Sequence, residues 1–578
     1  MSTGETAKLR WKKWAGRLVL ALLLVLTFTA RCHNHANVFH DNGVYFVDGD
    51  CYSRMTRAKM VSEGHWIIRH HDFENWPQGI KPHTTAPLDW MIVGLKSVVD
   101  VVCKIGGARL AGYRAQSLDV AGALISPLLG VLTAAWLWWW AGRLRLPFRA
   151  AMVLMFALSP ISVHGTVLGR PDHQSLLMLL LAVALGCELR LMHSEDDEKK
   201  IRRAWSLATV LAWGLALWVS LYEPLMLLVP VSVTHLLLER KKLLASRRAK
   251  KLAALLGFLA LIFFVEGWRA ELPGRELREG FAHWAASIGE LRHLNPTDSL
   301  LWEWLGLLVV LAPVLLCLAG REDHRAFAVL AGILLLFGLT VWQLRWGYFL
   351  LLAFAMSLPW MLRAFRSTRM AWIAFAVGLC PVVMSWSRTL HPTEKVAEDQ
   401  AWRQLSQARL RTISLAMKAG PRAGFLAPWW MSPQIAYWSG QPGVAGTSHQ
   451  SLPGILDTAR FYLSTDEAKA AEILHRRQVG WVIADNASFD VEQRDRLIAV
   501  TNSEVVLGVR SEEEPLAVIL AGHPRQAPGY LREVSPEELG LVIDLAPKSG
   551  RTVENQGMRI YATQMHRLYR VLPERGHD

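Results

Sequence analysis

Long apolar runs separated by gaps of alternating charge constrain this chain more than any other feature of its sequence. Eleven such runs lie in the first 387 of its 578 residues. A helix needs about 20 apolar residues to cross a hydrocarbon core, and several runs reach that length. We therefore predict a polytopic α-helical membrane protein, with spans near 18–31, 121–142, 147–166, 175–192, 204–222, 224–238, 252–266, 301–320, 326–343, 346–362 and 370–386.

The charges predict the orientation of these spans. The chain has 63 Lys and Arg against 49 Asp and Glu, a net charge of +14. From Arg388 onward 22 basic and 22 acidic residues cancel, so the surplus belongs to the membrane half, where it lies in the shorter gaps. Basic loops stay in the cytoplasm. We expect a multi-pass protein of the cell (inner) membrane with a cytoplasmic N-terminus and an extracytoplasmic (periplasmic) C-terminal domain.

Two apolar segments need separate interpretation. Residues 1–31 resemble a signal peptide, but no good small-x-small cleavage site follows, so we favour an uncleaved anchor. The segment Pro87–Val102 would reverse the charge alternation if it crossed the membrane. We predict a helix lying on the outer interface there.

The pattern divides the chain into two domains. Residues 1–386 are predicted to form the transmembrane domain, with long outer loops at about 31–118 and 267–299. Residues 387–578 are predicted to form a soluble α/β domain, with a helix from Thr465 to Arg477 capped by Ser464 or Thr465. Strands are predicted at Trp481–Asp485, Glu504–Val509, Leu516–Ala521, Met558–Ala562 and Arg567–Val571.

Ionisable residues near membrane spans are costly and often functional, and here they gather on the predicted outer face. Two or three carboxylates from separate loops can hold a hard divalent cation, which suits Mg²⁺ or Mn²⁺. An Arg binds phosphate oxygens, and paired Trp rings offer a contact surface for a peptide or a sugar. The candidates are Asp48 and Asp50, Asp172 with His173 and Gln174, Glu290, Arg345, and Trp429 with Trp430.

Each candidate also has a structural interpretation. Asp48-Gly49-Asp50 is most often a turn or a helix cap, and Asp172 can cap the helix that follows it. Arg345 can extend to the membrane interface, and the two Trp rings can belong to a core. Glu223 is predicted to cap a tight outer turn. Four histidines do not have the spacing of a compact zinc motif: His65, His70, His71 and His83.

Several motifs in this order resemble the catalytic subunit of oligosaccharyltransferase, a membrane glycosyltransferase that moves a lipid-linked glycan to asparagine. The order of the motifs carries the resemblance, since no single one is specific. They are Asp50-Cys51-Tyr52 with Arg54 and Arg57, Trp76-Pro77-Gln78-Gly79, Pro87-Leu88, Gly169-x-x-Asp172, Ser287-x-x-Glu290, Arg345 and Trp429-Trp430.

The resemblance implies a GT-C fold with about eleven to thirteen transmembrane helices. It implies that Asp50, Asp172 and Glu290 are catalytic and hold Mg²⁺ or Mn²⁺, with Asp50 and Glu290 facing the acceptor nitrogen. Arg345 would contact the donor phosphate. Asp48, His173 and Gln174 are weaker candidates, and Trp429 and Trp430 would bind the acceptor. The donor would be a sugar or oligosaccharide on a polyprenyl-(pyro)phosphate, and transfer would invert its anomeric carbon.

Two departures from the family pattern leave the acceptor open. Met431 stands where the family has an Asp that accepts a hydrogen bond from the hydroxyl of the acceptor, and a thioether accepts such a bond poorly. Gln174 stands where an acidic residue or a His is usual. The acceptor is thus a protein or, as the alternative, a glycolipid that receives a single sugar. A transporter and a non-catalytic paralogue are further alternatives, and we expect no nucleic-acid partner.

Overall fold

The computed structural model describes residues 3–573 except 83–85, 108–110, 193–198, 239–245, 269–273, 487–496, 512, 536–537, 540–553, 556–557 and 560–564. The chain forms two compact units. The helical unit comprises Met1–Val38, Thr84–Gly267 and Glu290–Thr393. The α/β unit comprises Phe39–His83, Trp268–Gly289 and Glu394–Asp578, so it includes parts of both predicted outer loops besides the tail.

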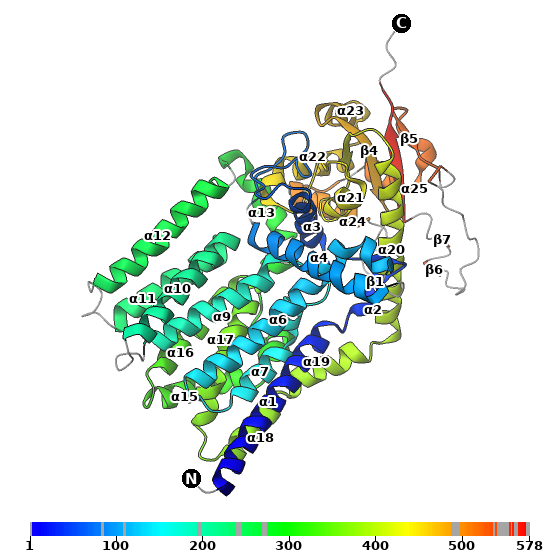
Figure 1. Cartoon of the computed structure of the whole chain (residues 1–578). Coiled ribbons are helices and arrows are strands. Elements are labelled where there is room, and N and C mark those ends of the chain that lie inside the picture. The colour runs from blue at the N-terminus through cyan, green and yellow to red at the C-terminus, as the bar shows by residue number, and fades with distance from the viewer. Residues whose placement is uncertain are drawn as a thin grey trace. The chain divides into compact units, whose positions relative to one another are not determined.

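Each predicted span coincides with one helix or with a broken pair (Figure 1). By length and composition, five helices of the described residues can cross a membrane, or seven if each bent pair is one span. This confirms a polytopic helical protein, while the count of eleven stays a prediction. The helices are α1 (Thr3–Arg31), α6 (Ser117–Arg143), α7 (Arg149–Leu158) with α8 (Pro160–His164), α9 (His173–Leu191), α10 (Lys199–Val219), α11 (Tyr222–Leu238), α12 (Ser246–Glu266), α14 (Ser299–Leu305) with α15 (Leu308–Gly320), α16 (Arg325–Trp342), α17 (Gly347–Arg363), and α18 (Thr368–Gly378) with α19 (Cys380–Leu390).

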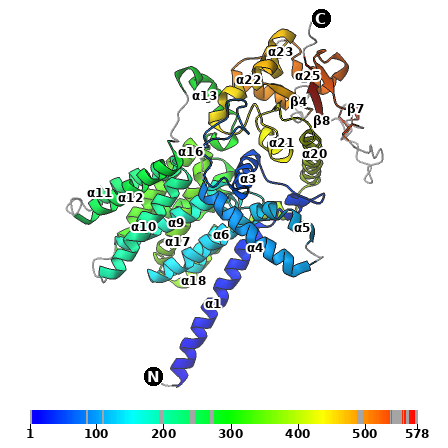
Figure 2. The same cartoon turned by 45° about the horizontal axis from the view of Figure 1, so that its top comes forward.

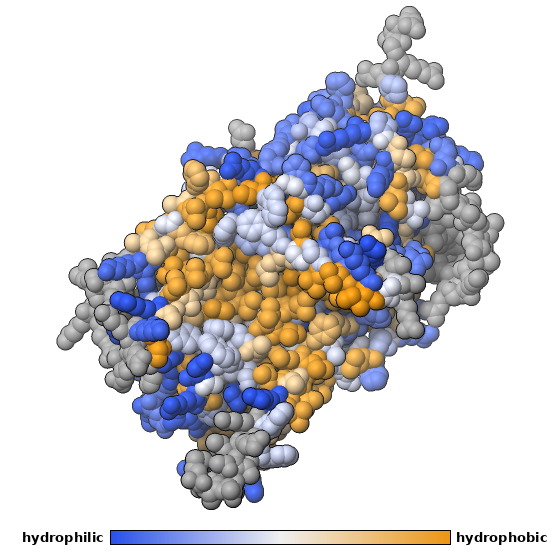
Figure 3. All heavy atoms as spheres, viewed as in Figure 1, coloured by the Kyte–Doolittle hydropathy of each residue, from blue (hydrophilic) through white to orange (hydrophobic). Residues whose placement is uncertain are grey.

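Helix α17 lies at the centre of the helical unit. All of its residues from Gly347 to Leu362 are buried, as expected of a helix that is apolar on every side. It packs against α7, α15 and α16. Helix α9 packs against α6 and α10 (Figure 2). Many apolar side chains of this unit are exposed, and they cover much of the face that Figure 3 shows. Examples are Leu128 and Leu132 of α6, Leu207 and Leu211 of α10, and Val310 and Val314 of α15.

Two spans bend where they touch each other. Helices α14 and α15 meet at 54°, and helices α18 and α19 meet at 41°. Leu307 N donates to Gly378 O at 2.9 Å across the two bends. Gly306 has φ +68°, and a Cβ there would lie 2.2 Å from Gly378 O, so only glycine fits this position. The predicted interfacial segment is also helical, as α4 (Ala86–Gly106), and it packs against α6.

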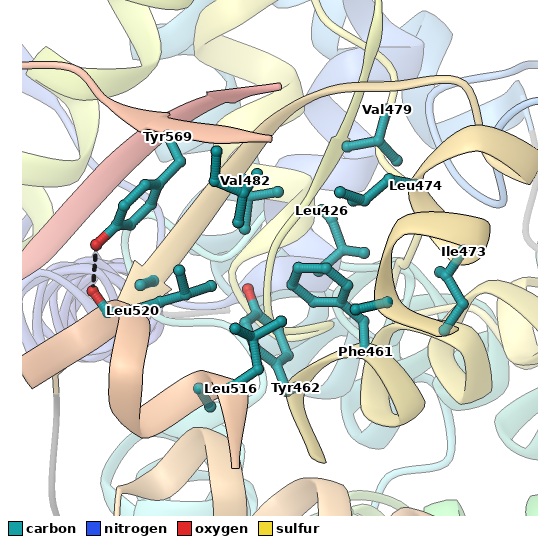
Figure 4. Close-up of a cluster of buried hydrophobic side chains, with 14 of the residues drawn as sticks. Leu426, Phe461, Tyr462, Ile473, Leu474, Val479, Val482, Leu516, Leu520 and Tyr569 are labelled. Carbon is teal, nitrogen blue, oxygen red and sulfur yellow. Dashed lines mark hydrogen bonds between the residues drawn. The ribbon is translucent and has the colours of Figure 1, made fainter. Parts of the chain in front are cut away.

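The α/β unit is built on one four-stranded sheet in the order β3-β4-β8-β5. Strand β3 (Gly424–Leu426) runs parallel to β4 (Val479–Asp485), and β8 (His566–Val571) is antiparallel to β4 and to β5 (Leu531–Glu533). The core lies between the sheet and several helices (Figure 4). The helices of the unit are α3 (Gly49–Ser62), α13 (Arg278–Ala286), α20 (Glu394–Lys418), α21 (Ser432–Ser439), α22 (Leu452–Leu463), α23 (Glu467–Arg476), α24 (Ile498–Leu507) and α25 (Leu516–Gly522).

Two of the strands predicted from the sequence are helices. The residues 504–507 end α24, and the residues 516–521 lie in α25. Short apolar runs do not distinguish a strand from a buried helix, and here the helical packing prevails. The strands at 481–485 and 567–571 are confirmed. The predicted 558–562 strand begins with β7 (Met558–Arg559), and the rest lies outside the described residues. The N-cap of α23 is Asp466, not Ser464 or Thr465, because Asp466 accepts from Ala468 N.

Arg477 ties the first outer loop to the tail within the α/β unit. Its Nη1 donates to Asn75 Oδ1, Trp76 O and Gln78 Oε1 at 3.2, 3.1 and 2.7 Å. Its Nε donates to Asp457 Oδ2 at 2.8 Å. A buried guanidinium with this many partners fixes the conformation of residues 75–78.

His71, in the same loop, makes the stability of this unit depend on pH. Burial, and then the positive charges of Arg57 and His70, lower the pKa of His71 to about 3. The unfolded chain therefore binds a proton near pH 6.5 that the folded unit does not bind, and stability falls as the pH drops from about 6.5 towards 3. The slope contributed by this residue is as much as about 1.4 kcal/mol per pH unit.

The measurement is chemical unfolding of the full chain followed by Trp fluorescence between pH 7 and 4. We expect His71→Leu to reduce the loss of stability on acidification. Glu74 also titrates differently in the folded unit, because burial raises its pKa. Since Glu74 is present in both proteins, the difference between wild type and His71→Leu reports on His71. His65 is exposed, so His65→Leu is the matched control and leaves the slope unchanged. An unchanged slope in His71→Leu would contradict the assignment.

Candidate active site

Polar side chains from separate helix ends meet in the helical unit around Glu290. Arg170 Nη2 donates to Glu290 Oε1 at 2.7 Å and lies 3.8 Å from Asp172 Oδ2. Gln174 Nε2 donates to Glu290 Oε2 at 3.2 Å. The side chain of Arg170 is only 4% exposed, whereas that of Glu290 is 34% exposed. Glu290 lies in the short turn Gly289–Leu291. Buried side chains therefore hold its carboxylate by hydrogen bonds, while part of its side chain remains accessible to solvent.

Glu290 is ionised at neutral pH. Burial acts to raise the pKa of its carboxyl, but the positive charges of Arg170 and then Arg345 outweigh this effect, and the pKa lies below its usual value. An ionised carboxylate accepts hydrogen bonds and has no proton to donate. The arrangement is suited to receive an N–H or O–H donor.

His164 and Tyr348 form a chain of hydrogen bonds that ends at Glu290. Their rings stack at an angle of 7°, and His164 Nδ1 lies 2.9 Å from Tyr348 Oη. Arg170 Nη1 lies 3.3 Å from His164 Nε2. Because a guanidinium only donates, Nε2 accepts this bond and Nδ1 carries the ring proton. The Tyr348 hydroxyl donates in turn to Glu290 Oε1 at 3.3 Å, which completes a directed set of hydrogen bonds.

A second set of contacts links Asp172 to Arg345. Asp172 is the N-cap of α9, as its structural interpretation predicts, and Oδ1 accepts from His173 N at 2.6 Å. The same oxygen lies 2.6 Å from His173 Nδ1. His173 Nε2 lies 3.7 Å from Glu223 Oε1. The Arg345 guanidinium pairs with the same carboxylate.

Asp48 and Asp50 lie in the α/β unit at the start of α3. Asp48 is the N-cap of this helix and accepts from Cys51 N at 3.0 Å, while Asp50 is exposed in the first turn. A Cβ on Gly49 would lie 2.8 Å from Thr447 Cγ2 and 3.0 Å from Trp430 O. The close approach that glycine allows thus brings the start of α3 against the backbone of the Trp429-Trp430 segment.

The two Trp residues are partly packed within the α/β unit. Trp429 Nε1 donates to Asn502 Oδ1 at 2.8 Å, and its ring meets the edges of Trp430 and Trp284 with centroids 5.8 and 5.9 Å apart. The cavity beside the pair has a volume of about 10 Å³, room for about one water. Both rings remain partly exposed, while Met431 is 6% exposed. A ligand of this segment therefore meets the outer parts of the rings.

The carboxylates suit a hard cation in their chemistry. Asp172 and Glu290 offer oxygen ligands of the kind that Mg²⁺ and Mn²⁺ prefer. In the helical unit the Arg170 guanidinium lies against both. Within the described ranges, no three side chains of His, Cys, Asp or Glu are grouped so as to hold a metal ion. A metal held by Asp50, Asp172 and Glu290 thus stays a prediction from the sequence.

His65, His70 and His71 likewise form no such group, and His83 lies outside the described residues. Sequence reasoning identified Asp172, Glu290 and Arg345 but assigned no site role to Arg170, Glu223 and Tyr348, which contact them, or to His164, which contacts Arg170 and Tyr348. Only Arg170 and Glu223 had a signal, since each is a charged residue beside a predicted span.

No protein-family model matches the chain. A curated relative, dolichyl-phosphooligosaccharide-protein glycotransferase 1 of Archaeoglobus fulgidus, is 25% identical over 171 residues, which are 29% of this chain and 26% of the relative. The chain thus spans about a quarter of the length of this relative in the match.

Solved structures resemble the chain over most of its length. Archaeal oligosaccharyltransferase AglB from Archaeoglobus fulgidus, in complex with an inhibitory peptide and a dolichol-phosphate, matches with a TM-score of 0.62 and 14% identity over 88% of this chain and 72% of that one. ArnT from Cupriavidus metallidurans bound to undecaprenyl phosphate matches with a TM-score of 0.51 and 14% identity over 82% of this chain and 93% of that one. The predicted resemblance is confirmed, and this multi-pass membrane protein has the GT-C fold of the oligosaccharyltransferase catalytic subunit.

Proposed function

We propose that the protein is a membrane glycosyltransferase that moves a glycan from a polyprenyl-(pyro)phosphate donor to a protein acceptor on the outer face of the membrane. The proposal rests on two features of the helical unit. One is the accessible carboxylate of Glu290, which Arg170 holds, and the other is the partly exposed guanidinium of Arg345. The AglB structure contains a dolichol-phosphate and a peptide, and these ligands have the chemistry proposed for the donor and the acceptor.

The residues have distinct roles in this reaction. Arg345 contacts the donor phosphate and offsets the charge that develops on it as the bond to the sugar breaks. Glu290, oriented by Arg170 and Tyr348, accepts a hydrogen bond from the acceptor nitrogen. That nitrogen forms the new bond to the anomeric carbon from the side opposite to the departing phosphate, so the configuration inverts. The acceptor proton passes to a carboxylate, and the polyprenyl-(pyro)phosphate leaves.

The orientation follows from charge. Because the basic surplus lies in the short gaps, the N-terminus is proposed to be cytoplasmic and the α/β unit extracytoplasmic. Trp429 and Trp430 would meet the acceptor there through the exposed parts of their rings.

The first test replaces Asp50 with Ala in the full chain and measures transfer from a lipid-linked oligosaccharide to a labelled Asn-containing peptide. We expect at least about a hundredfold loss of transfer, because Asp50 is proposed to act on the acceptor nitrogen. Glu63, exposed at the other end of α3, gives the matched control Glu63→Ala, which retains activity. Full transfer by the Asp50 variant would refute this role.

The metal proposal makes a separate prediction. A divalent cation on Asp50, Asp172 and Glu290 would polarise the reacting groups and neutralise negative charge. We therefore expect EDTA to abolish transfer and excess Mg²⁺ or Mn²⁺ to restore it, while Ca²⁺ in excess of EDTA serves as the control for non-specific charge effects. Undiminished transfer in EDTA would remove the metal from the proposal and leave the other roles intact.

A second candidate is a transferase that moves a single lipid-linked sugar to a glycolipid. Met431 favours it, because this position lacks the carboxylate that would read the hydroxyl of Ser or Thr in a peptide acceptor. Mass spectrometry of the products formed with a peptide and with a glycolipid, offered together, separates the candidates. A glycosylated lipid alone would support this second function over the first.

A further inference from the structure

Glu223 is a buried carboxylate with three partners at the donor side of the candidate site. Its side chain is 1% exposed, at the start of α11. Besides Arg345 and His173 it meets Ser220, whose Oγ donates to Glu223 Oε2 at 2.5 Å. A buried carboxylate is stable only where it is paired and hydrogen-bonded, as Glu223 is here.

The contacts leave part of Arg345 available. A guanidinium has five N–H groups, and Glu223 takes one of them at Nη2. Across the described part of the chain, Nε and Nη1 of Arg345 donate to no protein acceptor. The ring of Tyr222 lies 5.5 Å from the guanidinium carbon, and the side chain of Arg345 is 20% exposed. The guanidinium is thus fixed through one nitrogen and can bind a phosphate through the others.

Glu223 also reaches the catalytic carboxylate. Its Oε1 lies 3.7 Å from His173 Nε2, and His173 Nδ1 lies 2.6 Å from Asp172 Oδ1. One connected set of side chains therefore runs from Arg345 through Glu223 and His173 to Asp172. A displacement of Arg345 would therefore alter the position of Asp172, and the reverse, because each side chain of the set contacts the next.

We propose that Glu223 is a positioning residue, which holds the Arg345 guanidinium in the orientation that binds the donor phosphate and fixes that orientation relative to Asp172. The inference rests on the proposed function, since it assigns to the same site the residue that sets its affinity for a polyprenyl phosphate. Glu223 acts through Arg345 and does not itself touch the donor.

The test is binding of undecaprenyl phosphate to the full chain in detergent, for wild type, Glu223→Ala, Arg345→Ala and the double variant. We expect each single variant to bind about tenfold more weakly or worse. The double variant is expected to bind no more weakly than Arg345→Ala, because residues that act as one unit are not additive. Glu266 is a matched control, being 3% exposed and bonded to Trp218 Nε1 at 2.7 Å. Glu266→Ala is expected to keep wild-type affinity.

Glu223→Gln keeps an acceptor oxygen for Arg345 Nη2 and is expected to bind within about threefold of wild type. If thermal unfolding shows that Glu223→Ala does not fold, Glu223→Asp carries the same test, because its shorter side chain cannot hold Arg345 Nη2 in the same place. We then expect Glu223→Asp to bind about tenfold more weakly than wild type and to add no loss to that of Arg345→Ala. Wild-type affinity in Glu223→Ala, or losses that add in the double variant, would overturn the inference. A folded wild type that binds no undecaprenyl phosphate would overturn the proposed function as well, so the two failures are distinguishable.

Discussion

Replacing Glu290 with Gln is expected to reduce glycan transfer by a factor of about a hundred to ten thousand. The amide has nearly the shape of the carboxylate but carries no charge, so it is a far weaker acceptor for the proton of the attacking group. It also places an uncharged group beside Arg170, whose guanidinium lies 2.7 Å from Glu290 Oε1. The measurement is single-turnover transfer at saturating donor and acceptor, which reports the chemical step without product release.

Glu279 gives a matched control in the chain segment before Glu290. It is exposed in the first turn of α13, and Glu279→Gln is expected to transfer at the wild-type rate. A Glu290→Gln enzyme with more than a tenth of wild-type activity would show that another group accepts the proton. Binding of undecaprenyl phosphate is expected to remain measurable in this variant, since Glu290 is not assigned to the donor.

Replacing Arg170 with Met is expected to affect both activity and stability. Met fills similar space but leaves Glu290 and Asp172 without their shared cation, and it removes the donor that fixes the tautomer of His164. Because Glu290 is about one third exposed, water partly compensates, and we expect a loss of about 1–3 kcal/mol in unfolding free energy. We expect transfer to fall about a hundredfold, since the carboxylate loses its orientation.

Arg363 provides the control for this change. It pairs with Glu322 at 2.8 Å, but the two side chains are 53% and 67% exposed, and such surface pairs contribute little. Arg363→Met is expected to unfold and react as wild type does. Thermal unfolding in detergent and the transfer assay are read on the same samples. Normal transfer by a destabilised Arg170 variant would assign Arg170 to stability alone.

The membrane architecture could be predicted from hydrophobic periodicity and charge, because the surrounding lipid or water constrains every residue of a span. The α/β unit was harder to predict. Residues 504–507 and 516–521 of its apolar runs lie in helices, and a short apolar segment can have the same composition in a helix as in a strand. The strands at 481–485 and 567–571 contain aromatic as well as β-branched residues, including Trp481 and Tyr569, and were identified.

Some residues of the candidate site could likewise be identified from the sequence, and others could not. Asp172, Glu290 and Arg345 stood out as charged residues beside apolar segments. Glu223 stood there too, but its partner Arg345 is 122 positions away in sequence, and nothing local shows that the two meet. His164 and Tyr348 lie within apolar stretches, 184 positions apart, and only the fold reveals their stacking. Pairwise contacts between distant segments were therefore the part that one sequence could not provide.

The α/β unit is built from segments that lie far apart in the sequence, so the ribosome makes them at very different times. Its first segment, 39–83, is made long before its last strand, β8, which lies inside the sheet between β4 and β5. At about 5–20 residues per second, the ribosome needs roughly 25–100 s to add the residues between them. Until residue 477 is made, Asn75, Trp76 and Gln78 have no Arg477 to bind, and until residue 571 is made the sheet lacks a complete β8. A nascent chain of this protein thus carries an unfinished domain through most of its translation, and a chain released before residue 571 could not complete it.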